Sequence, residues 1–449
     1  MIETQDRMAV CIIGLGYVGL TLAVTMASLG FHVVGVEKNK DAVKKLKGGK
    51  AHFFEPGLDK LVTETLQQGT LQLFEKIPEQ FAGKTFIITV GTPLNSDGQV
   101  NLTMIKDVSR EVSYHLKDGD LVILRSTVKV GTTENLVAPI LEKSGKFFDL
   151  AFCPERTLEG AALKELRYLP QIIGGISETS TKRAQEIFLK ITQSLVSVSD
   201  ASTAEMIKLV DNSSRDLLFA FSNEIAVACD TLSISATEVI QSASLGYSRT
   251  RIAMPGPVGG PCLEKDPYIL CESTRSLGFV PRLAKTARQI NEAQPEYVVR
   301  FISEKFKYIR GSVDINKVSV LGIAFKGQPL TSDTRGTMAL PILEKLKEFF
   351  PTAEFYGFDP LVPSSEIINL GFLDVDEIAD AFEDSDLVII ANNNPMFSNL
   401  DLNSLSKTMS ENSILYDFWN NFYRKQLELV PGVSYFSLGS HRSEMVGTP

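Results

Sequence analysis

The chain has 449 residues, of which 44% are hydrophobic and 22% charged, a composition typical of a globular protein with two or three domains. Its net charge of −9, without a basic cluster, argues against a nucleic-acid partner. The 5 cysteines lack Cys-x-x-Cys spacing and the 4 histidines are scattered, which argues against a disulfide framework or a zinc site. We therefore expect no bound metal and a reducing compartment, the cytoplasm.

The first predicted unit has the spacing of a dinucleotide-binding site. A strand at 9–13 leads into the turn Gly14-Leu15-Gly16-Tyr17-Val18-Gly19, a helix runs to Gly30, and a second strand at 32–36 ends at Glu37. Gly14 allows the tight turn, Gly16 the approach of a pyrophosphate, and Gly19 the close packing of helix and strand. The Glu37 carboxylate is suited to ribose hydroxyls and repels a 2′-phosphate, which favours NAD over NADP.

A membrane helix or signal peptide is the alternative interpretation of this segment, because no charged residue occurs from Met8 through Val36. Three glycines in its first half disfavour a stable membrane helix, and the polar start is unlike that of a signal peptide. We therefore expect no membrane partner.

The remainder of the first part, residues 1–200, alternates strands with helices and predicts a parallel sheet covered on both faces. Further strands are expected at 86–90, 120–125, 149–153 and 171–175. The first two of these lead into Gly91-Thr92-Pro93 and Ser126-Thr127. Both turns are expected at the carboxyl edge of the sheet, where ligands bind.

Long helices are expected in a central part, residues 201–312. One runs from Ala201 to about Asp230 and opens with Ser202 and Glu205 in the spacing of a capping box. Another spans 282–310 with a break at Pro295.

The last part, residues 313–449, predicts a second doubly wound domain, with strands beginning near Val318, Phe355 and Leu387. It lacks a Gly-x-Gly-x-x-Gly turn, so no second dinucleotide is expected there. The predicted fold class is α/β, with two Rossmann-like domains joined by a central helical region.

Lys208, Asn212 and Arg215 are spaced four and three residues apart on the long helix. Such a stripe is equally typical of a solvated helix face. Because apolar neighbours such as Leu209 and Leu217 indicate a largely buried helix, polar groups here need partners, which favours a ligand-facing role.

The loop from Pro255 to Asp266 contains three glycines and three prolines and carries Cys262 just before Lys265 and Asp266. A thiol near a cation and a carboxylate is a candidate nucleophile, although a Gly/Pro turn with a buried cysteine explains the pattern as well. Other candidates, each equally typical of a solvated loop, are Glu155, Glu159, Arg249, Arg251 and Asp333-Thr334-Arg335.

These motifs together resemble the UDP-glucose/GDP-mannose dehydrogenase family, the nucleotide-sugar 6-dehydrogenases. The resemblance runs through nearly the whole chain, on Gly14–Gly19, Glu55-Pro56-Gly57-Leu58, Gly91-Thr92-Pro93, Ser126-Thr127-Val128, Pro154-Glu155-Arg156, Lys208 with Asn212, Gly259-Gly260-Pro261-Cys262 with Lys265-Asp266, Ala324-Phe325-Lys326 and Asp333-Thr334-Arg335. It implies an NAD domain, a central dimerisation region and a C-terminal domain that binds a nucleotide sugar, in a homodimer or a higher homo-oligomer.

The resemblance implies a four-electron oxidation of a sugar C6 alcohol to a carboxylate. Cys262 would form a thiohemiacetal and then a thioester, while Lys208 and Asn212 stabilise negative charge on the C6 oxygen. Asp266 and Thr127 would assist proton transfer through a water, and Glu155 would be the general base of thioester hydrolysis. A thiol also suits this chemistry independently, because an aldehyde must form a tetrahedral adduct before it can lose a hydride.

The remaining site residues follow from the same motifs. The expected cofactor-binding residues are Gly14, Gly16, Tyr17, Val18, Gly19, Glu37, Gly91, Thr92, Pro93, Ser126, Thr127 and Lys265. The expected substrate-binding residues are Glu155, Arg156, Leu158, Glu159, Lys208, Asn212, Arg215, Arg251, Gly259, Gly260, Phe325, Lys326 and Arg335.

The sugar is open between two branches of the family. Pro154-Glu155-Arg156 is similar to the enzymes of UDP-N-acetylhexosamines, such as UDP-N-acetylmannosamine, whereas Lys265 before Asp266 is similar to the UDP-glucose and GDP-mannose enzymes. We expect a UDP-N-acetylhexosamine, with UDP-glucose as the alternative, and a product used for capsule or cell-surface polysaccharide. A two-electron dehydrogenase of the 6-phosphogluconate type and a non-catalytic NAD sensor are rivals, but neither requires Cys262.

Overall fold

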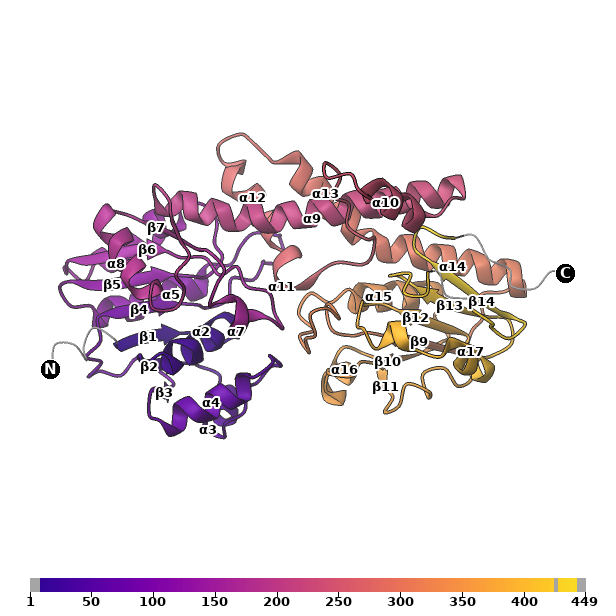
Figure 1. Ribbon diagram of the computed structural model, residues 1–449, viewed down its shortest axis with the longest axis horizontal. Helices are drawn as coiled ribbons and strands as arrows, with labels where there is room; N and C mark the ends of the chain where they lie inside the picture. The colour runs from indigo at the N-terminus through magenta and orange to yellow at the C-terminus, as the bar shows by residue number, and fades with distance from the viewer. Residues whose placement is uncertain (1–8, 424–426, 442–449) are drawn as a thin grey trace. The chain divides into compact units, whose positions relative to one another are not determined.

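The computed structural model describes residues 9–423 and 427–441 (Figure 1). The chain forms two compact units, one from Met1–Asn212 with Lys265–Pro281 and the other from Ser213–Glu264 with Arg282–Pro449. The 32-residue helix α9 (Ala201–Leu232) contributes to both units. The three-part division at residues 200 and 312 therefore stays a prediction, because the central helices are shared between two units.

The first unit contains an eight-stranded sheet in the order β3-β2-β1-β4-β5-β6-β7-β8. Its strands are β1 (Ala9–Ile13), β2 (His32–Val36), β3 (Leu71–Phe74), β4 (Thr85–Ile88), β5 (Asp120–Leu124), β6 (Phe148–Phe152), β7 (Gln171–Gly175) and β8 (Leu195–Ser197). All neighbours pair in parallel, as predicted, except β6 and β7, which pair antiparallel. The strands β3 and β8 were not predicted from the sequence.

Helices cover both faces of this sheet. Successive β1 residues alternate between two cores: Val10 belongs to the buried cluster that contains Leu20 of α2, and Cys11 to the cluster that contains Ile105 of α5. The helices of the unit are α2 (Tyr17–Ser28), α3 (Lys40–Lys47), α4 (Leu58–Gln67), α5 (Thr103–His115), the π-helix η1 (Thr133–Val137), α6 (Ala138–Glu142), α7 (Ala162–Glu165), α8 (Glu178–Phe188) and α12 (Asp266–Arg275). The uncharged segment before Glu37 is thus a βαβ unit, and among the described residues no helix is long and apolar enough to cross a membrane.

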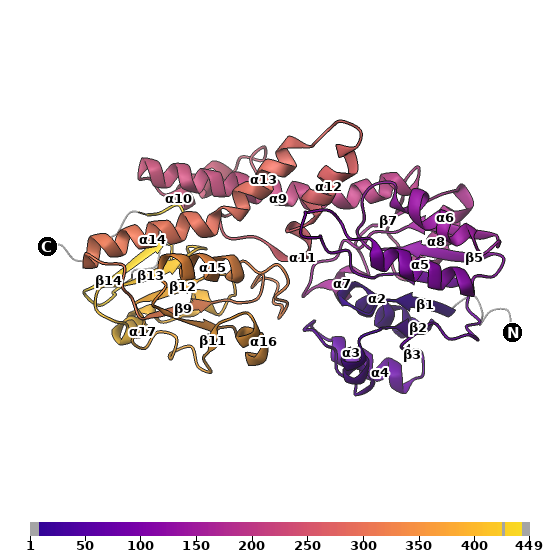
Figure 2. The same cartoon turned by 180° about the vertical axis from the view of Figure 1, so that it is seen from behind.

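The second unit contains a six-stranded parallel sheet in the order β11-β10-β9-β12-β13-β14. Its strands are β9 (Lys317–Leu321), β10 (Glu354–Phe358), β11 (Leu373–Asp374), β12 (Leu387–Ile390), β13 (Ser413–Asp417) and β14 (Val433–Ser437). Its helices are α10 (Ala236–Ser244), α11 (Gly260–Leu263), α13 (Arg282–Glu292), α14 (Gln294–Arg310), α15 (Ala339–Phe349), α16 (Ser364–Asn369) and α17 (Leu402–Leu405), with 3-10 turns η2 (Phe397–Asn399) and η3 (Ser406–Thr408). Figure 2 shows both sheets from the opposite side.

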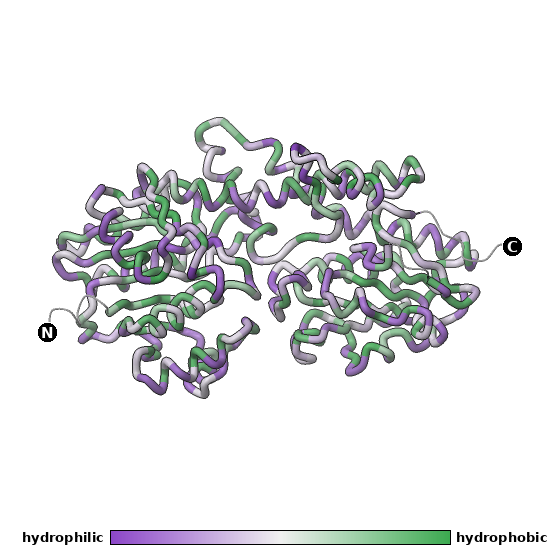
Figure 3. The backbone as a smooth tube through the Cα atoms, viewed as in Figure 1, coloured by the Kyte–Doolittle hydropathy of each residue, from purple (hydrophilic) through white to green (hydrophobic). Residues whose placement is uncertain are grey.

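The two sheets repeat one topology. Six strands of each follow the 3-2-1-4-5-6 order of a doubly wound nucleotide-binding fold. Their strands are mostly hydrophobic along the tube of Figure 3, as expected for parallel sheets buried on both faces. The predicted fold class, with two Rossmann-like domains and a long central helix, is confirmed.

One local prediction was wrong. Ser202 and Glu205 do not form a capping box; instead Asp200 Oδ1 accepts the Thr203 N–H at 2.6 Å. The Glu205 carboxylate accepts N–H groups from Gly131 and Thr133 of the loop after β5. A partner distant in sequence therefore replaced the local one.

Candidate active site

The turn after β1 has the geometry that a dinucleotide needs. Gly14 has a φ of +93°, which favours glycine, and its N–H donates to Val36 O at 2.8 Å. A Cβ on Gly19 would lie 1.8 Å from Gly14 O, so glycine is required for α2 to pack here. A Cβ on Gly16 would meet no protein atom within 4 Å, which leaves the N-terminus of α2 open to a phosphate group.

Glu37 is held beside this turn. Its Oε2 accepts the Leu15 N–H at 2.8 Å, and its Oε1 accepts the Asn39 N–H at 2.9 Å. The carboxylate is half-buried. The glycine turn and this oriented acid fit the pyrophosphate and adenosine ribose of NAD.

Tyr17 and Glu55 link α2 to the loop after β6. The Tyr17 hydroxyl donates to the Glu55 carboxylate, and the Gly160 N–H donates to Tyr17 Oη at 2.9 Å and to Glu55 Oε2 at 2.7 Å. Burial and the adjacent Glu55 carboxylate raise the pKa of Tyr17. The Glu55-Pro56-Gly57 motif therefore anchors the loop that carries the candidate substrate contacts Leu158 and Glu159.

The loops after β4 and β5 are joined to the glycine turn. Thr89 Oγ1 donates to Gly14 O at 2.7 Å, and Thr92 Oγ1 donates to Thr127 O at 2.5 Å. Ser126 Oγ donates to Ile88 O at 3.4 Å. The candidate cofactor contacts, Gly91-Thr92-Pro93 and Ser126-Thr127, thus lie at the same edge of the sheet as the glycine turn.

The buried Asn212 of α9 contacts the start of α12. Asn212 Nδ2 donates to Asp266 Oδ2 at 2.6 Å, and Lys265 Nζ donates to Asp266 Oδ1 at 2.7 Å. Lys208, one turn before Asn212, is also buried. Arg215 is exposed, so only Lys208 and Asn212 of the three residues expected on one helix face are buried.

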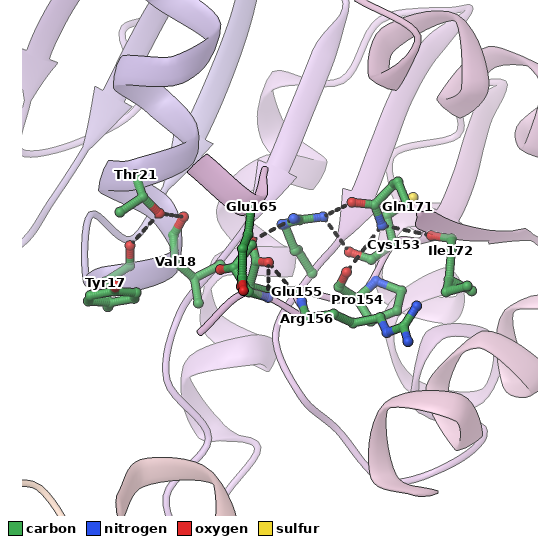
Figure 4. A network of polar contacts seen from close by, with 12 residues as sticks. Tyr17, Val18, Thr21, Cys153, Pro154, Glu155, Arg156, Glu165, Gln171 and Ile172 are labelled. Atoms are coloured by element: carbon green, nitrogen blue, oxygen red, sulfur yellow. Dashed lines mark hydrogen bonds and ion pairs between the residues drawn. The ribbon is translucent and has the colours of Figure 1, made fainter. Parts of the chain in front are cut away.

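The Glu155 carboxylate lies in a dense network at the end of β6 (Figure 4). Its Oε2 accepts from Arg125 Nη2 at 2.6 Å, and its Oε1 accepts the N–H groups of Arg156 at 2.7 Å and Thr157 at 2.8 Å. Burial alone would raise the pKa of Glu155, but Arg125, the Thr157 N–H and Lys208 hold it below the ordinary value. Glu155 is therefore a stable anion near Lys208.

The neighbouring candidates have protein partners. Arg156 Nε lies 2.7 Å from Asp211 Oδ2 of α9, and the Leu158 N–H donates to Glu165 Oε2 at 2.7 Å. These contacts fix the path of the loop after β6 within the first unit.

The cysteine loop belongs to the second unit and is positioned by a buried arginine. Arg288, 1% exposed, donates to Val258 O at 2.9 Å and Leu263 O at 3.2 Å, and it pairs with Asp216 Oδ1 at 2.9 Å. Asn223 exchanges two hydrogen bonds with the Gly256 backbone. Cys262 lies between these anchors in the short helix α11.

The loop glycines pack against the second unit itself. A Cβ on Gly259 would lie 2.3 Å from Gly336 O, and one on Gly260, which has a φ of +87°, would lie 2.3 Å from Phe325 Cδ2. Internal packing therefore requires a glycine at both positions.

Cys262 differs from the other cysteines. It is partly exposed, whereas Cys11, Cys153, Cys229 and Cys271 are buried. Burial raises the pKa of Cys153 to about 12, so that thiol is unreactive near neutral pH. Cys262 is thus the best candidate nucleophile among the five.

Three cationic candidates lie in the second unit. Arg335 Nε lies 3.0 Å from Asp333 Oδ1, and Lys326 Nζ lies 5.3 Å from the centre of the Phe325 ring. Arg251 is exposed. All three are accessible cations suited to an anionic ligand.

The acid after β10 in the second sheet differs in its surroundings from the acid after β2 in the first sheet. Asp359 occupies the position of Glu37, but it is buried and accepts four backbone N–H groups, from Ile323, Ala324, Leu361 and Val362. Protein N–H groups occupy the acceptor positions of the Asp359 carboxylate, whereas Glu37 is half-buried beside an open glycine turn.

Three family models match successive segments of the chain. The NAD binding domain of the UDP-glucose/GDP-mannose dehydrogenase family matches residues 8–192, its central domain 202–293 and its UDP binding domain 319–424. The chain belongs to this family.

Relatives support the same assignment. The UDP-N-acetyl-D-mannosamine dehydrogenase of Campylobacter jejuni is 38% identical over 350 residues, covering 75% of this chain and 83% of its own. That of Pyrococcus horikoshii is 32% identical over 415 residues, covering 91% and 94%. The solved structure of the Pyrococcus horikoshii UDP-D-ManNAc dehydrogenase superimposes with a TM-score of 0.85 at 31% identity, covering 96% of this chain and 99% of that one.

Family membership makes the chain an NAD-dependent oxidoreductase that acts on a UDP-sugar. The match to the NAD binding domain contains β1 to β7 of the first sheet, and the match to the UDP binding domain contains β10 to β13 of the second sheet and most of β9. The cofactor prediction is confirmed, and the residues assigned to each step remain predictions.

Sequence reasoning missed the residues that hold the site together. Arg125, Arg288, Asn223 and Glu205 are buried, polar and at least 25 positions from the partners named above. The one available signal was a charged residue within an apolar run, such as Arg125 directly after the strand Asp120–Leu124.

Proposed function

We propose that this dehydrogenase oxidises the C6 hydroxyl of a UDP-N-acetylhexosamine, with UDP-N-acetylmannosamine as the first candidate, through four electrons to the uronate. The observation that carries the four-electron assignment is Cys262, a partly exposed thiol in a loop held by Arg288 and Asn223. The choice of sugar rests on the names of the relatives in Campylobacter jejuni and Pyrococcus horikoshii. UDP-glucose is the alternative, favoured by Lys265 before Asp266.

Cys262, Lys208 and Asn212 act on the sugar C6 between the two oxidations. Bound NAD supplies the hydride acceptor for both oxidations, one molecule for each. Between them, Cys262 Sγ forms a bond to C6 of the aldehyde, and Lys208 and Asn212 stabilise the resulting oxyanion. Loss of the second hydride leaves a thioester, whose C–S bond breaks when water attacks C6.

Three residues handle protons in this scheme. Asp266 is buried and oriented by Asn212 and Lys265, which supports a role in proton transfer during the oxidations, with Thr127 holding a water. Glu155 orients the water that attacks the thioester. A carboxylate has about four acceptor positions, and three on Glu155 are filled by protein donors, so one on Oε2 stays open to water.

The substrate contacts are also assigned by proposal. Arg156, Leu158 and Glu159 contribute from the first unit, together with the α9 residues. Those from the second unit are Arg215, Arg251, Gly259, Gly260, Phe325, Lys326 and Arg335. The exposed cations among them suit the diphosphate of the nucleotide.

We also propose a homodimer formed by the central helices. Large apolar side chains are exposed on α9 and α10 and the turn between them: Leu218, Phe221, Leu232, Ile234 and Val239. An exposed apolar patch of this kind is typical of a protein interface. Sedimentation velocity of the wild type should give a mass of about two chains, and Phe221→Glu should lower it to the mass of one chain. A wild-type protein with the mass of one chain would contradict the proposal.

The test of the function replaces the nucleophile. Cys262→Ser should abolish uronate formation from UDP-N-acetylmannosamine, measured by mass spectrometry of the product, while NAD still binds. Cys229→Ala removes a buried thiol instead and should retain activity. Full oxidation by Cys262→Ser would contradict the thioester route.

A further inference from the structure

Arg125 is a buried cation to which the reaction scheme assigns no role. It follows β5 and is 2% exposed. Its Nη1 donates to Cys153 O at 3.0 Å and to Gln171 Oε1 at 2.9 Å, and its Nη2 donates to Glu155 Oε2 at 2.6 Å. All three partners flank or form the turn that presents Glu155.

Gln171 completes the support of that turn. Its Nε2 donates to Pro154 O at 3.1 Å while its Oε1 accepts from Arg125. Figure 4 shows Gln171 and Glu155 on either side of the Cys153–Pro154 backbone. The carbonyls of residues 153 and 154 and the carboxylate of residue 155 are therefore all fixed by one guanidinium and one amide.

Two cations stabilise the charged form of Glu155, and one of them pairs with it directly. The charged groups that act on it are Arg125, directly after β5, and Lys208 of α9, while Arg156 and Glu165 of α7 line the same small void. Arg125 makes the direct ion pair, with both side chains almost fully buried. Without Arg125, burial would favour the neutral acid, because a buried carboxylate is stable only when it is paired.

We propose that Arg125 is the positioning residue of the hydrolytic half-reaction: it keeps Glu155 charged and oriented, with one acceptor position on Oε2 left for the attacking water. The inference rests on the proposed function, since it assumes the Cys262 thioester. A neutral Glu155 could not accept the water's proton, so hydrolysis would fail although both oxidations proceed.

The experiment compares Arg125→Met and Arg125→Lys with the wild type. The thioester on Cys262 is followed by intact-protein mass spectrometry after mixing with NAD and UDP-N-acetylmannosamine, at pH values from 6 to 9. In Arg125→Met the pKa of Glu155 rises, so hydrolysis should slow as the pH falls and the adduct should accumulate. We expect the hydrolysis rate of Arg125→Met to be lowest at pH 6 and to recover toward pH 9, because the ionised fraction of a carboxyl falls about tenfold for each pH unit below its pKa.

Arg125→Lys is the matched control, because it retains the charge but loses the guanidinium fork. It should show the flat pH profile of the wild type with a lower rate, and it keeps the test open if Arg125→Met does not fold. An equal loss at all pH values in Arg125→Met, or a wild-type rate in Arg125→Lys, would overturn the proposal.

Failure of the proposed function would look different. In that case the wild type itself would form no Cys262 adduct. A wild type that forms the adduct, beside Arg125 variants that hydrolyse it normally, would overturn the role of Arg125 alone.

Discussion

Gly16 and Gly19 lie three residues apart in one turn, yet the structure predicts opposite consequences for adding a methyl group. In Gly19→Ala the new Cβ would lie 1.8 Å from Gly14 O and 2.6 Å from Thr89 Oγ1. Since an ordinary van der Waals contact of a Cβ begins at 3.4 Å, α2 must shift by roughly 1.6 Å. Such overpacking costs about 1–3 kcal/mol, and a unit of this size loses about 2–4 °C in Tm per kcal/mol.

In Gly16→Ala the added Cβ meets no protein atom within 4 Å, so the apoprotein should melt within about 1 °C of the wild type. The methyl group would instead occupy the approach of the NAD pyrophosphate. We expect NAD affinity to fall at least about tenfold, or 1.4 kcal/mol.

Calorimetry measures both quantities: scanning calorimetry without NAD gives Tm, and titration with NAD gives Kd. The reasoning would be refuted if Gly16→Ala lowered the apoprotein Tm as much as Gly19→Ala, or if it bound NAD with wild-type affinity.

Three further predictions follow from buried groups. A thiol reagent should modify one cysteine of the native protein rapidly and none in Cys262→Ser; a second thiol reacting at the same rate would contradict the burial of the others. Arg288→Met leaves the Asp216 carboxylate without its ion pair and should cost about 3–5 kcal/mol in urea unfolding, whereas a loss below about 1 kcal/mol would show that the pair is dispensable. Burial raises the pKa of Glu205 from 4.5 to about 7. Between these pH values the folded state binds a proton that the unfolded state has lost, so the free energy of unfolding falls as the pH rises from 4.5 to 7. Glu205→Gln should flatten that part of the stability profile, measured by urea unfolding at pH 5 and 7.5, and an unchanged slope would reject the assignment.

The sequence was most informative where local constraints decide the structure. The bounds of β1 and β2 agree with the predicted strands because an apolar run ends at a glycine turn and at an acid. The break between α13 and α14 was predicted from Pro295. The strand β3 was missed because it is a four-residue edge strand with alternate residues exposed, and its existence depends on pairing with β2.

The polar framework of the site could not be predicted in the same way. Arg125 and Glu155 are 30 residues apart, and Arg288 and Asp216 are 72 apart. Any of several acids could have paired with either arginine, and the sheet topology decides which one does. Glu205 shows the converse, since a local capping pattern gave way to a stronger partner in the loop after β5.

The central claim is that one active site removes four electrons from one UDP-sugar. It is tested most directly by the yield of NADH with limiting UDP-N-acetylmannosamine and excess NAD, with UDP-glucose assayed in parallel. The account predicts about two NADH per sugar, since each hydride transfer reduces one NAD. A yield of one NADH per sugar would contradict it and would leave Cys262 without a role in the chemistry.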